Sequence, residues 1–155
     1  MTIFIGSDHA GFALKEHIKH YLERGGYEVV DKGAYNLNEN DDYPDFIAPV
    51  AKSVADSNGE SLGIILGGSG QGEAIVANRF PGVRAVIYYG FGDTGVSEEI
   101  IKMSREHNNA NILSLGARFL SEVDAMHAVK LWLDSKFSND DRHIRRLKKL
   151  DNLKI

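Results

Sequence analysis

The sequence predicts an α/β fold, a Rossmann-like three-layer αβα sandwich around a five-stranded parallel sheet. Short apolar runs alternate along the chain with longer segments whose apolar residues recur at helical spacing. Such alternation favours parallel strands with helices on both faces of the sheet. The 155 residues contain no internal repeat and no interdomain linker, so we expect one domain over residues 1–155.

Five short apolar segments have the length and composition of buried strands. The first, Ile3-Phe4-Ile5, ends at Gly6, and the third runs directly into a glycine-rich segment over residues 67–72. The expected strands cover residues 3–5, 27–30, 62–66, 83–88 and 111–115.

Six segments are expected to form helices. The first starts near Phe12 and stops before Gly25 and Gly26, because glycine commonly ends helices. The second contains Pro49, whose ring cannot donate a backbone hydrogen bond, so Pro49 should lie in the first turn or kink the helix. The other expected helices cover residues 73–79, 93–105, 121–132 and 140–150.

The fifth expected helix has both a cap and an apolar face. Ser121, with Asp124 three residues later, resembles an N-terminal cap. The apolar positions of this helix are Val123, Met126, Val129 and Trp132.

Composition excludes several classes of function. The absence of cysteine excludes disulfides, thiolate catalysis and cysteine–zinc sites, and it fits a reducing cytoplasm. We expect no signal peptide, and no apolar stretch reaches the roughly 18 residues that span a bilayer. A net charge of −4 argues against nonspecific nucleic-acid binding. A cytoplasmic protein without a membrane or nucleic-acid partner is therefore expected.

The charges are distributed unevenly, and a run of charge is usually a solvated face. That interpretation is the default for both of the runs here. The acidic stretch consists of Glu39, Asp41, Asp42 and Asp45, and the basic C-terminal stretch of Arg142, Arg145, Arg146, Lys148 and Lys149.

Residues 6–11 follow the first strand, where α/β sheets bind ligands. They place Asp8 beside His9 and lack the G-x-G-x-x-G fingerprint of dinucleotide sites. Asp8 suits hydrogen bonds to sugar hydroxyls, and a protonated His9 can contact an anion. The alternative is that Asp8 only caps the first helix, and spacing alone leaves these interpretations equal.

The glycine-rich segment follows the third strand and leads into a helix. Its backbone can approach a ligand closely, and its amides can form an anion-binding nest. It is neither a nucleotide P-loop nor a G-x-S-x-G elbow. Glu73 stands directly after the last glycine. It either complements the helix dipole or, beside such a nest, acts as a base next to oxyanion-stabilising amides.

The histidines give weak signals by themselves. His107 and Asn108 lie in residues 104–111, at the start of the fifth strand. His17, His20 and His127 fall within expected helices, as surface or partly packed residues. No metal-ligand spacing is present, so no metal site is expected.

Several motifs, taken together and in order, resemble one known family. They are residues 6–11, 42–45, 67–73 with Ala77-Asn78, 104–111, 115–118 and 142–146. This set resembles the ribose-5-phosphate isomerase B family, which also includes galactose-6-phosphate isomerase subunits. The resemblance implies an aldose–ketose isomerase that interconverts ribose 5-phosphate and ribulose 5-phosphate through an enediolate. It implies no metal and no organic cofactor.

The resemblance also implies catalytic roles. Many members have a cysteine base at the position of Gly67, and this chain resembles the subgroup with a glutamate base at the position of Glu73. Asp8 and His107 would assist ring opening, with His107 as the proton donor. Ser69 would relay a proton between O1 and O2 of the substrate, and the backbone of residues 68–72 would stabilise the enediolate.

The implied substrate-binding residues are Asp8, His9, Tyr43, Gly68, Ser69, Gly70, Gln71, Gly72, Asn108, Arg118, Arg142 and Arg146. Of these, His9, Arg118, Arg142 and Arg146 match phosphate ligands, for which the planar arginine fork is well suited. Arg142 and Arg146 are four residues apart, so the basic helix over residues 140–150 presents both on one face. In the family the active site is shared between two subunits, which implies a homodimer or a pair of dimers forming a tetramer.

Other functions remain open at this point. The substrate can be another sugar phosphate, such as galactose 6-phosphate, allose 6-phosphate or a tetrose phosphate. A non-catalytic sugar-phosphate-binding subunit is also possible, because a fold alone does not prove an activity. The sequence assigns no role to Asp93-Thr94-Gly95-Val96 or to the tail over residues 151–155.

Overall fold

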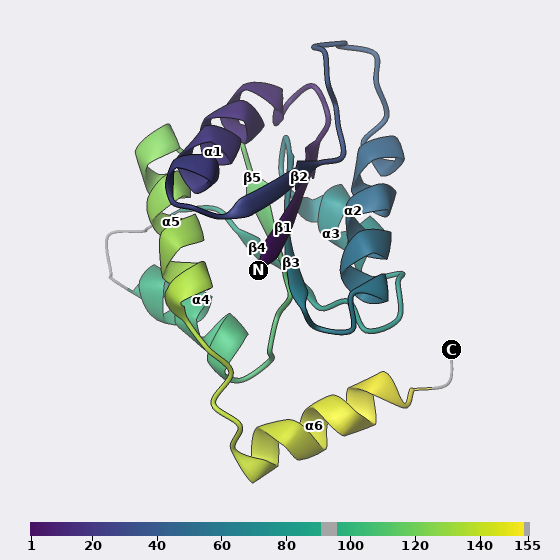
Figure 1. The fold of residues 1–155 in the computed structure, drawn as a ribbon, viewed down its shortest axis with the longest axis vertical. Helices are drawn as coiled ribbons and strands as arrows, with labels where there is room; N and C mark the ends of the chain where they lie inside the picture. Colours follow the sequence, from purple (N-terminus) through teal and green to yellow (C-terminus); the bar gives the residue numbers. More distant parts are fainter. Residues whose placement is uncertain (91–95, 154–155) are drawn as a thin grey trace.

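A computed structural model describes residues 1–90 and 96–153, and within them the chain forms a five-stranded sheet between two layers of helices (Figure 1). The strands are β1 (Thr2–Ser7), β2 (Glu28–Asp31), β3 (Ser61–Gly67), β4 (Ala85–Tyr88) and β5 (Ile112–Gly116). Their order is β2-β1-β3-β5-β4, and every neighbouring pair is parallel. The predicted fold class is confirmed.

Helices cover both faces of the sheet. They are α1 (Phe12–Arg24), α2 (Pro44–Asp56), α3 (Gln71–Ala77), α4 (Val96–Glu106), α5 (Glu122–Asp134) and α6 (Asp141–Asp151). Helices α1, α4 and α5 lie on one face, and α2 and α3 on the other (Figure 1). Helix α6 projects away from both layers. In the described part of the chain, no helix is both long and apolar enough to cross a membrane.

Helices α2 and α3 differ in detail from the prediction. Helix α3 begins at Gln71, so Glu73 lies in its first turn and not at its start. Pro44 takes the first position of α2, which suits proline, whereas Pro49 lies past the first turn and leaves one helical hydrogen bond unmade. Helix α4 is described from Val96, and Asp93, Thr94 and Gly95 lie outside the described residues.

The fifth helix has the predicted cap but a different buried face. The Ser121 hydroxyl accepts a hydrogen bond from the Asp124 N–H at 3.1 Å, which confirms the cap. Val123 is 73% exposed, so its predicted packing is wrong. It lies about 200° around the helix from the buried Ala125, because each helical residue turns by about 100°. The buried face consists of Ala125, Ala128, Val129 and Trp132.

The core has two parts, separated by the sheet. Every residue of β3 is buried, and its side chains alternate between the two faces. Ile64 packs with the cluster under α1 and α5, whereas Ile65 packs with the cluster under α2. This alternation anchors β3 at the centre of the molecule.

The strand order creates a crevice at the carboxyl edge of the sheet. Strands β1 and β3 are neighbours, but the helices that follow them, α1 and α3, lie on opposite faces. Connections that leave in opposite directions open a crevice at such a switch point, where α/β folds bind ligands. Residues 8–11 and 68–73 therefore border the expected binding position.

Residues 32–43 connect β2 to α2 beside this crevice, and their first part is firmly held. The Ser7 N–H donates to the Gly33 carbonyl at 2.8 Å, and the Ala34 N–H donates to the Ser7 carbonyl at 2.7 Å. The fully buried Lys15 donates its Nζ to the Asp31 carboxylate and, at 2.7 Å, to the Ala34 carbonyl. The connection is thus tied to both β1 and α1.

Candidate active site

A pocket of about 290 Å³ lies at the switch point. Its lining consists of Asp8, His9, Ala10, Tyr43, Gly68, Ser69, Gly72, Glu73, Arg118 and Phe119. The structure therefore brings together the predicted site residues that follow β1, β3 and β5, with Tyr43 from the β2–α2 connection. Gly70 and Gln71, at the start of α3, do not line the pocket.

Glu73 is a buried carboxyl group in this pocket, with only 3% of its surface exposed. Burial raises the pKa of Glu73, and the nearby charge of Asp8 raises it further. Hydrogen bonds from the backbone N–H groups of Glu73 and Gly70 partly oppose this rise. A carboxylate with a raised pKa is a better general base than an exposed one.

The side chain of Glu73 fills the space beside Gly67. A Cβ atom built on Gly67 would lie 1.8 Å from Glu73 Oε1 and 2.2 Å from Cδ, distances at which atoms overlap. Position 67 therefore has no room for a side chain while Glu73 points inward. The carboxylate lies where a short side chain at position 67 would project.

Hydrogen bonds from β5 and from the two residues that follow it hold the glycine-rich loop in place. The Ala117 and Arg118 N–H groups donate to the carbonyls of Gly67 and Gly68 at 2.9 and 3.1 Å. The Ser114 hydroxyl donates to the Gly70 carbonyl at 2.7 Å. Gly70 has a φ of 74°, which an L side chain rarely adopts, and a Cβ there would meet Ser114 Oγ at 3.0 Å.

Asp8 stabilises the turn before α1 and lines the pocket. Its Oδ1 accepts hydrogen bonds from the N–H groups of Ala10 and Gly11, at 3.0 and 3.2 Å. These bonds stabilise the turn that precedes α1, whose N-cap, Gly11, has no side-chain cap. Asp8 is also 93% buried and lines the pocket beside Glu73. The alternative that Asp8 caps the first helix is wrong, because its bonds go to Ala10 and Gly11, which precede the helix.

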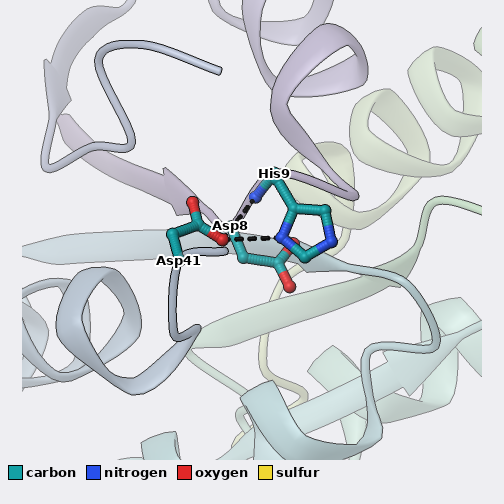
Figure 2. A group of neighbouring side chains, drawn as sticks. All are labelled: Asp8, His9 and Asp41. Carbon is teal, nitrogen blue, oxygen red and sulfur yellow. Dashed lines mark hydrogen bonds and ion pairs between the residues drawn. The ribbon is translucent and has the colours of Figure 1, made fainter. Parts of the chain in front are cut away.

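His9 is paired with Asp41, a residue that the sequence placed on a solvated acidic face. Asp41 Oδ1 lies 2.6 Å from His9 Nδ1 and also accepts the His9 backbone N–H at 3.1 Å (Figure 2). The Asp41 side chain is only 6% exposed, so the solvated-face interpretation is wrong at this position. The hydrogen bond to Asp41 raises the pKa of His9, against a smaller opposing effect of desolvation.

His107 and Asn108 lie elsewhere in the chain. They precede β5, so they are at the amino edge of the parallel sheet, whereas the pocket lies at its carboxyl edge. Five strand residues at about 3.3 Å each separate these edges by roughly 15 Å. The structure therefore does not place His107 and Asn108 in the pocket of the same chain.

The basic helix α6 contacts His107. The ring of His107 packs on that of His143 with centroids 4.4 Å apart, which joins the end of α4 to α6. His143 is buried, and its Nδ1 lies 2.9 Å from Ser138 Oγ. Arg142 and Arg146 are exposed on α6 and do not line the pocket. The linking role of His143 was not predicted from the sequence.

The described residues also include one cluster that could hold a cation, formed by Asp8, His9 and Asp41. The closest atoms of this cluster already have partners, because Asp41 Oδ1 binds His9 and Asp8 Oδ1 binds backbone N–H groups. We therefore interpret it as a hydrogen-bonded group.

The fold and pocket define an α/β protein with a buried carboxyl group, Glu73, in a switch-point pocket that His9 and Arg118 also line. Residues 3–150 match the model of the family described as Ribose/Galactose Isomerase. The chain belongs to this family, as the motifs predicted.

Individual relatives agree with this assignment. A ribose-5-phosphate isomerase B from Mycolicibacterium paratuberculosis is 41% identical over 148 residues, which cover 95% of this chain and 87% of that protein. The solved structure of ribose-5-phosphate isomerase B from Mycoplasma genitalium with bound ribulose-5-phosphate has a TM-score of 0.89 at 36% identity, covering 97% of this chain and 93% of that one. The Clostridium thermocellum enzyme has a TM-score of 0.87 at 41% identity, covering 97% and 95% of the two chains.

The contact between Gly67 and Glu73 predicts energetic coupling. We expect Gly67→Ala to destabilise the wild-type protein by about 1–3 kcal/mol, because the added methyl group overlaps the carboxylate. In a Glu73→Ala background the same change should cost almost nothing, since the overlapping atoms are gone. Urea unfolding of the four proteins measures the coupling. Equal costs in the two backgrounds would contradict it.

Proposed function

We propose that this protein is an aldose–ketose isomerase that interconverts D-ribose 5-phosphate and D-ribulose 5-phosphate, with Glu73 as the base. The observation that carries the proposal is the buried Glu73 carboxyl group beside the glycine loop of the switch-point pocket. Relatives named ribose-5-phosphate isomerase B support the substrate, and one of their structures contains ribulose-5-phosphate. A cytoplasmic location fits this metabolic role.

In the proposed reaction Glu73 removes the proton from C2 of the open-chain aldose. The electrons of the broken C–H bond form the C1–C2 double bond, and the negative charge on the former carbonyl oxygen is stabilised by backbone groups of residues 68–72. Ser69 relays a proton between O1 and O2. Glu73 then returns its proton to C1, which leaves the carbonyl group at C2 and regenerates the base.

Other pocket residues bind and prepare the substrate in this proposal. Asp8 binds a sugar hydroxyl and assists opening of the ring, and Tyr43 lines the sugar-binding part of the pocket. The Tyr43 ring lies close to the backbone of Gly72, since a Cβ atom built on Gly72 would lie 2.8 Å from it. His9 and Arg118 bind the phosphate group, for which a cationic ring and a guanidinium group are suitable donors.

His107, Asn108, Arg142 and Arg146 complete the site from a second subunit in this proposal. Within one chain they lie at the opposite edge of the sheet from Glu73, so a single chain has two incomplete halves. A two-fold symmetric dimer joins each half to the complementary half of its partner and creates two equal sites. His107 then acts as the proton donor in ring opening, and the arginines of α6 bind phosphate. We propose a homodimer, or two such dimers in a tetramer.

One alternative substrate class has support of its own. The family description includes galactose isomerases, so a six-carbon phosphate is the second candidate. The same base and loop serve either sugar, and the length between the carbonyl and the phosphate decides between them. Comparison of kcat/KM for sugar phosphates of four to six carbons tests the substrate. A kcat/KM for ribose 5-phosphate far below that for another sugar phosphate would refute our choice.

The role of Glu73 is tested by Glu73→Gln, which keeps the shape of the side chain and removes the base. We expect kcat to fall by about 100- to 10,000-fold, with loss of exchange between the substrate C2 proton and solvent. Steady-state kinetics and proton NMR in deuterated water measure both effects. Glu60→Gln is the matched control, because Glu60 is exposed and lies outside the pocket. Full activity of Glu73→Gln would refute the assignment.

The shared site is tested by mixing two inactive variants, Glu73→Gln and His107→Ala. If subunits exchange at random, half of the dimers are hybrids, and each hybrid has one site with both residues intact. We therefore expect about a quarter of the wild-type activity to return. Glu73→Gln mixed with Asp8→Ala is the control, since both changes affect the same half and no site is restored. Absence of recovery in the first mixture would contradict the shared site.

A further inference from the structure

We propose that Asp41 is a positioning residue for phosphate recognition, which holds the ring of His9 so that its Nε2 atom is presented as a donor to the anion. The inference rests on the proposed function, in which His9 binds the substrate phosphate. Asp41 lies outside the pocket lining, in the connection that also supplies Tyr43.

Two contacts to a single oxygen atom carry the inference. Asp41 Oδ1 accepts the backbone N–H of His9 at 3.1 Å and lies 2.6 Å from Nδ1 of the same residue. The backbone contact fixes the start of the side chain, and the ring contact fixes its rotation. Figure 2 shows Nε2 on the side of the ring that faces away from Asp41.

The protonation of His9 follows from this geometry. A carboxylate at Nδ1 selects the form in which Nδ1 carries hydrogen, so a neutral ring has a bare Nε2, which repels an anion. Only the doubly protonated ring donates from Nε2. The hydrogen bond to Asp41 raises the pKa of His9, desolvation lowers it, and the charge of Asp8 raises it again, while Arg118 lowers it. The charged or titratable groups around His9 are Asp8, Asp41, Tyr43, Glu73 and Arg118.

The start of the connection is held without Asp41. Residues 32–34 are already bound to β1 and to Lys15. The second oxygen, Asp41 Oδ2, is buried without a hydrogen-bond partner among the described residues, which is unfavourable for a carboxylate. A neutral amide at this position should therefore leave the fold intact. The negative charge of Asp41 is explained if it controls the orientation and protonation of the His9 ring.

Asp41→Asn tests the inference, because an asparagine oxygen can still accept both hydrogen bonds but has no charge. His9 should then lose its proton at lower pH than in the wild type, since the carboxylate that favours the protonated form is gone. We expect KM for ribose 5-phosphate to rise by about 10-fold at alkaline pH and to converge with the wild-type value at acid pH, with little change in kcat. Asp42→Asn is the control, because it removes the same charge from an exposed neighbour.

Two measurements do not require turnover, and they separate this inference from the isomerase proposal. NMR titration of the His9 ring reports its protonation directly, and inorganic phosphate probes the anion site as a function of pH. A lower titration point of His9 and weaker phosphate binding at alkaline pH in Asp41→Asn support the inference, even if ribose 5-phosphate is not the substrate. An unchanged His9 titration, or weakening of the same size at every pH, would overturn it. The thermal unfolding midpoints of Asp41→Asn and Asp42→Asn should equal that of the wild type.

Discussion

The contact between the Glu73 carboxylate and the bare backbone of Gly67 is the constraint on which the site depends. It lies at the end of β3, every residue of which is buried. The carboxyl group reaches this position because α3 begins at Gln71 and places Glu73 in its first turn, pointing back over the loop. Burial there raises the pKa of Glu73 and brings the group beside the backbone of the loop. One packing contact thus determines the position of the carboxyl group and its chemical character.

The topology of the sheet supplies the remaining groups. Because α1 and α3 leave β1 and β3 on opposite faces, the loops after these strands separate and form the pocket between them. Strand β5 adds Arg118 from the other side of β3, and hydrogen bonds from residues 117 and 118 hold the glycine loop against it. The long connection before α2 crosses the same edge and brings Tyr43 to the pocket and Asp41 to His9. Four segments that are distant in sequence therefore meet at one point.

The sequence allowed much of this arrangement to be predicted, because hydrophobic periodicity and glycine positions report local structure directly. The strands and helices were found with small shifts of their ends, and Asp8, His9, Gly68, Glu73 and Arg118 do meet in one pocket. Asp41 was missed because it stands in a run of acidic residues, and a charge pattern gives no sign that one member folds inward. Val123 was misplaced because a four-residue apolar pattern does not fix which side of a helix faces the sheet. The separation of His107 from Glu73 follows from the predicted parallel sheet, because His107 precedes the fifth strand and Glu73 follows the third.

The absence of a side chain at Gly67 affects the resistance of the site to oxidation. A thiolate base would be open to peroxides and electrophiles, which convert cysteine stepwise to sulfenic, sulfinic and sulfonic acids. A carboxylate does not take part in this chemistry, and the chain has no cysteine elsewhere. With Glu73 as the proposed base, the site would keep its proton-transferring group under oxidising conditions that inactivate a thiol enzyme. The remaining vulnerable side chains would be the three methionines, none of which lines the pocket.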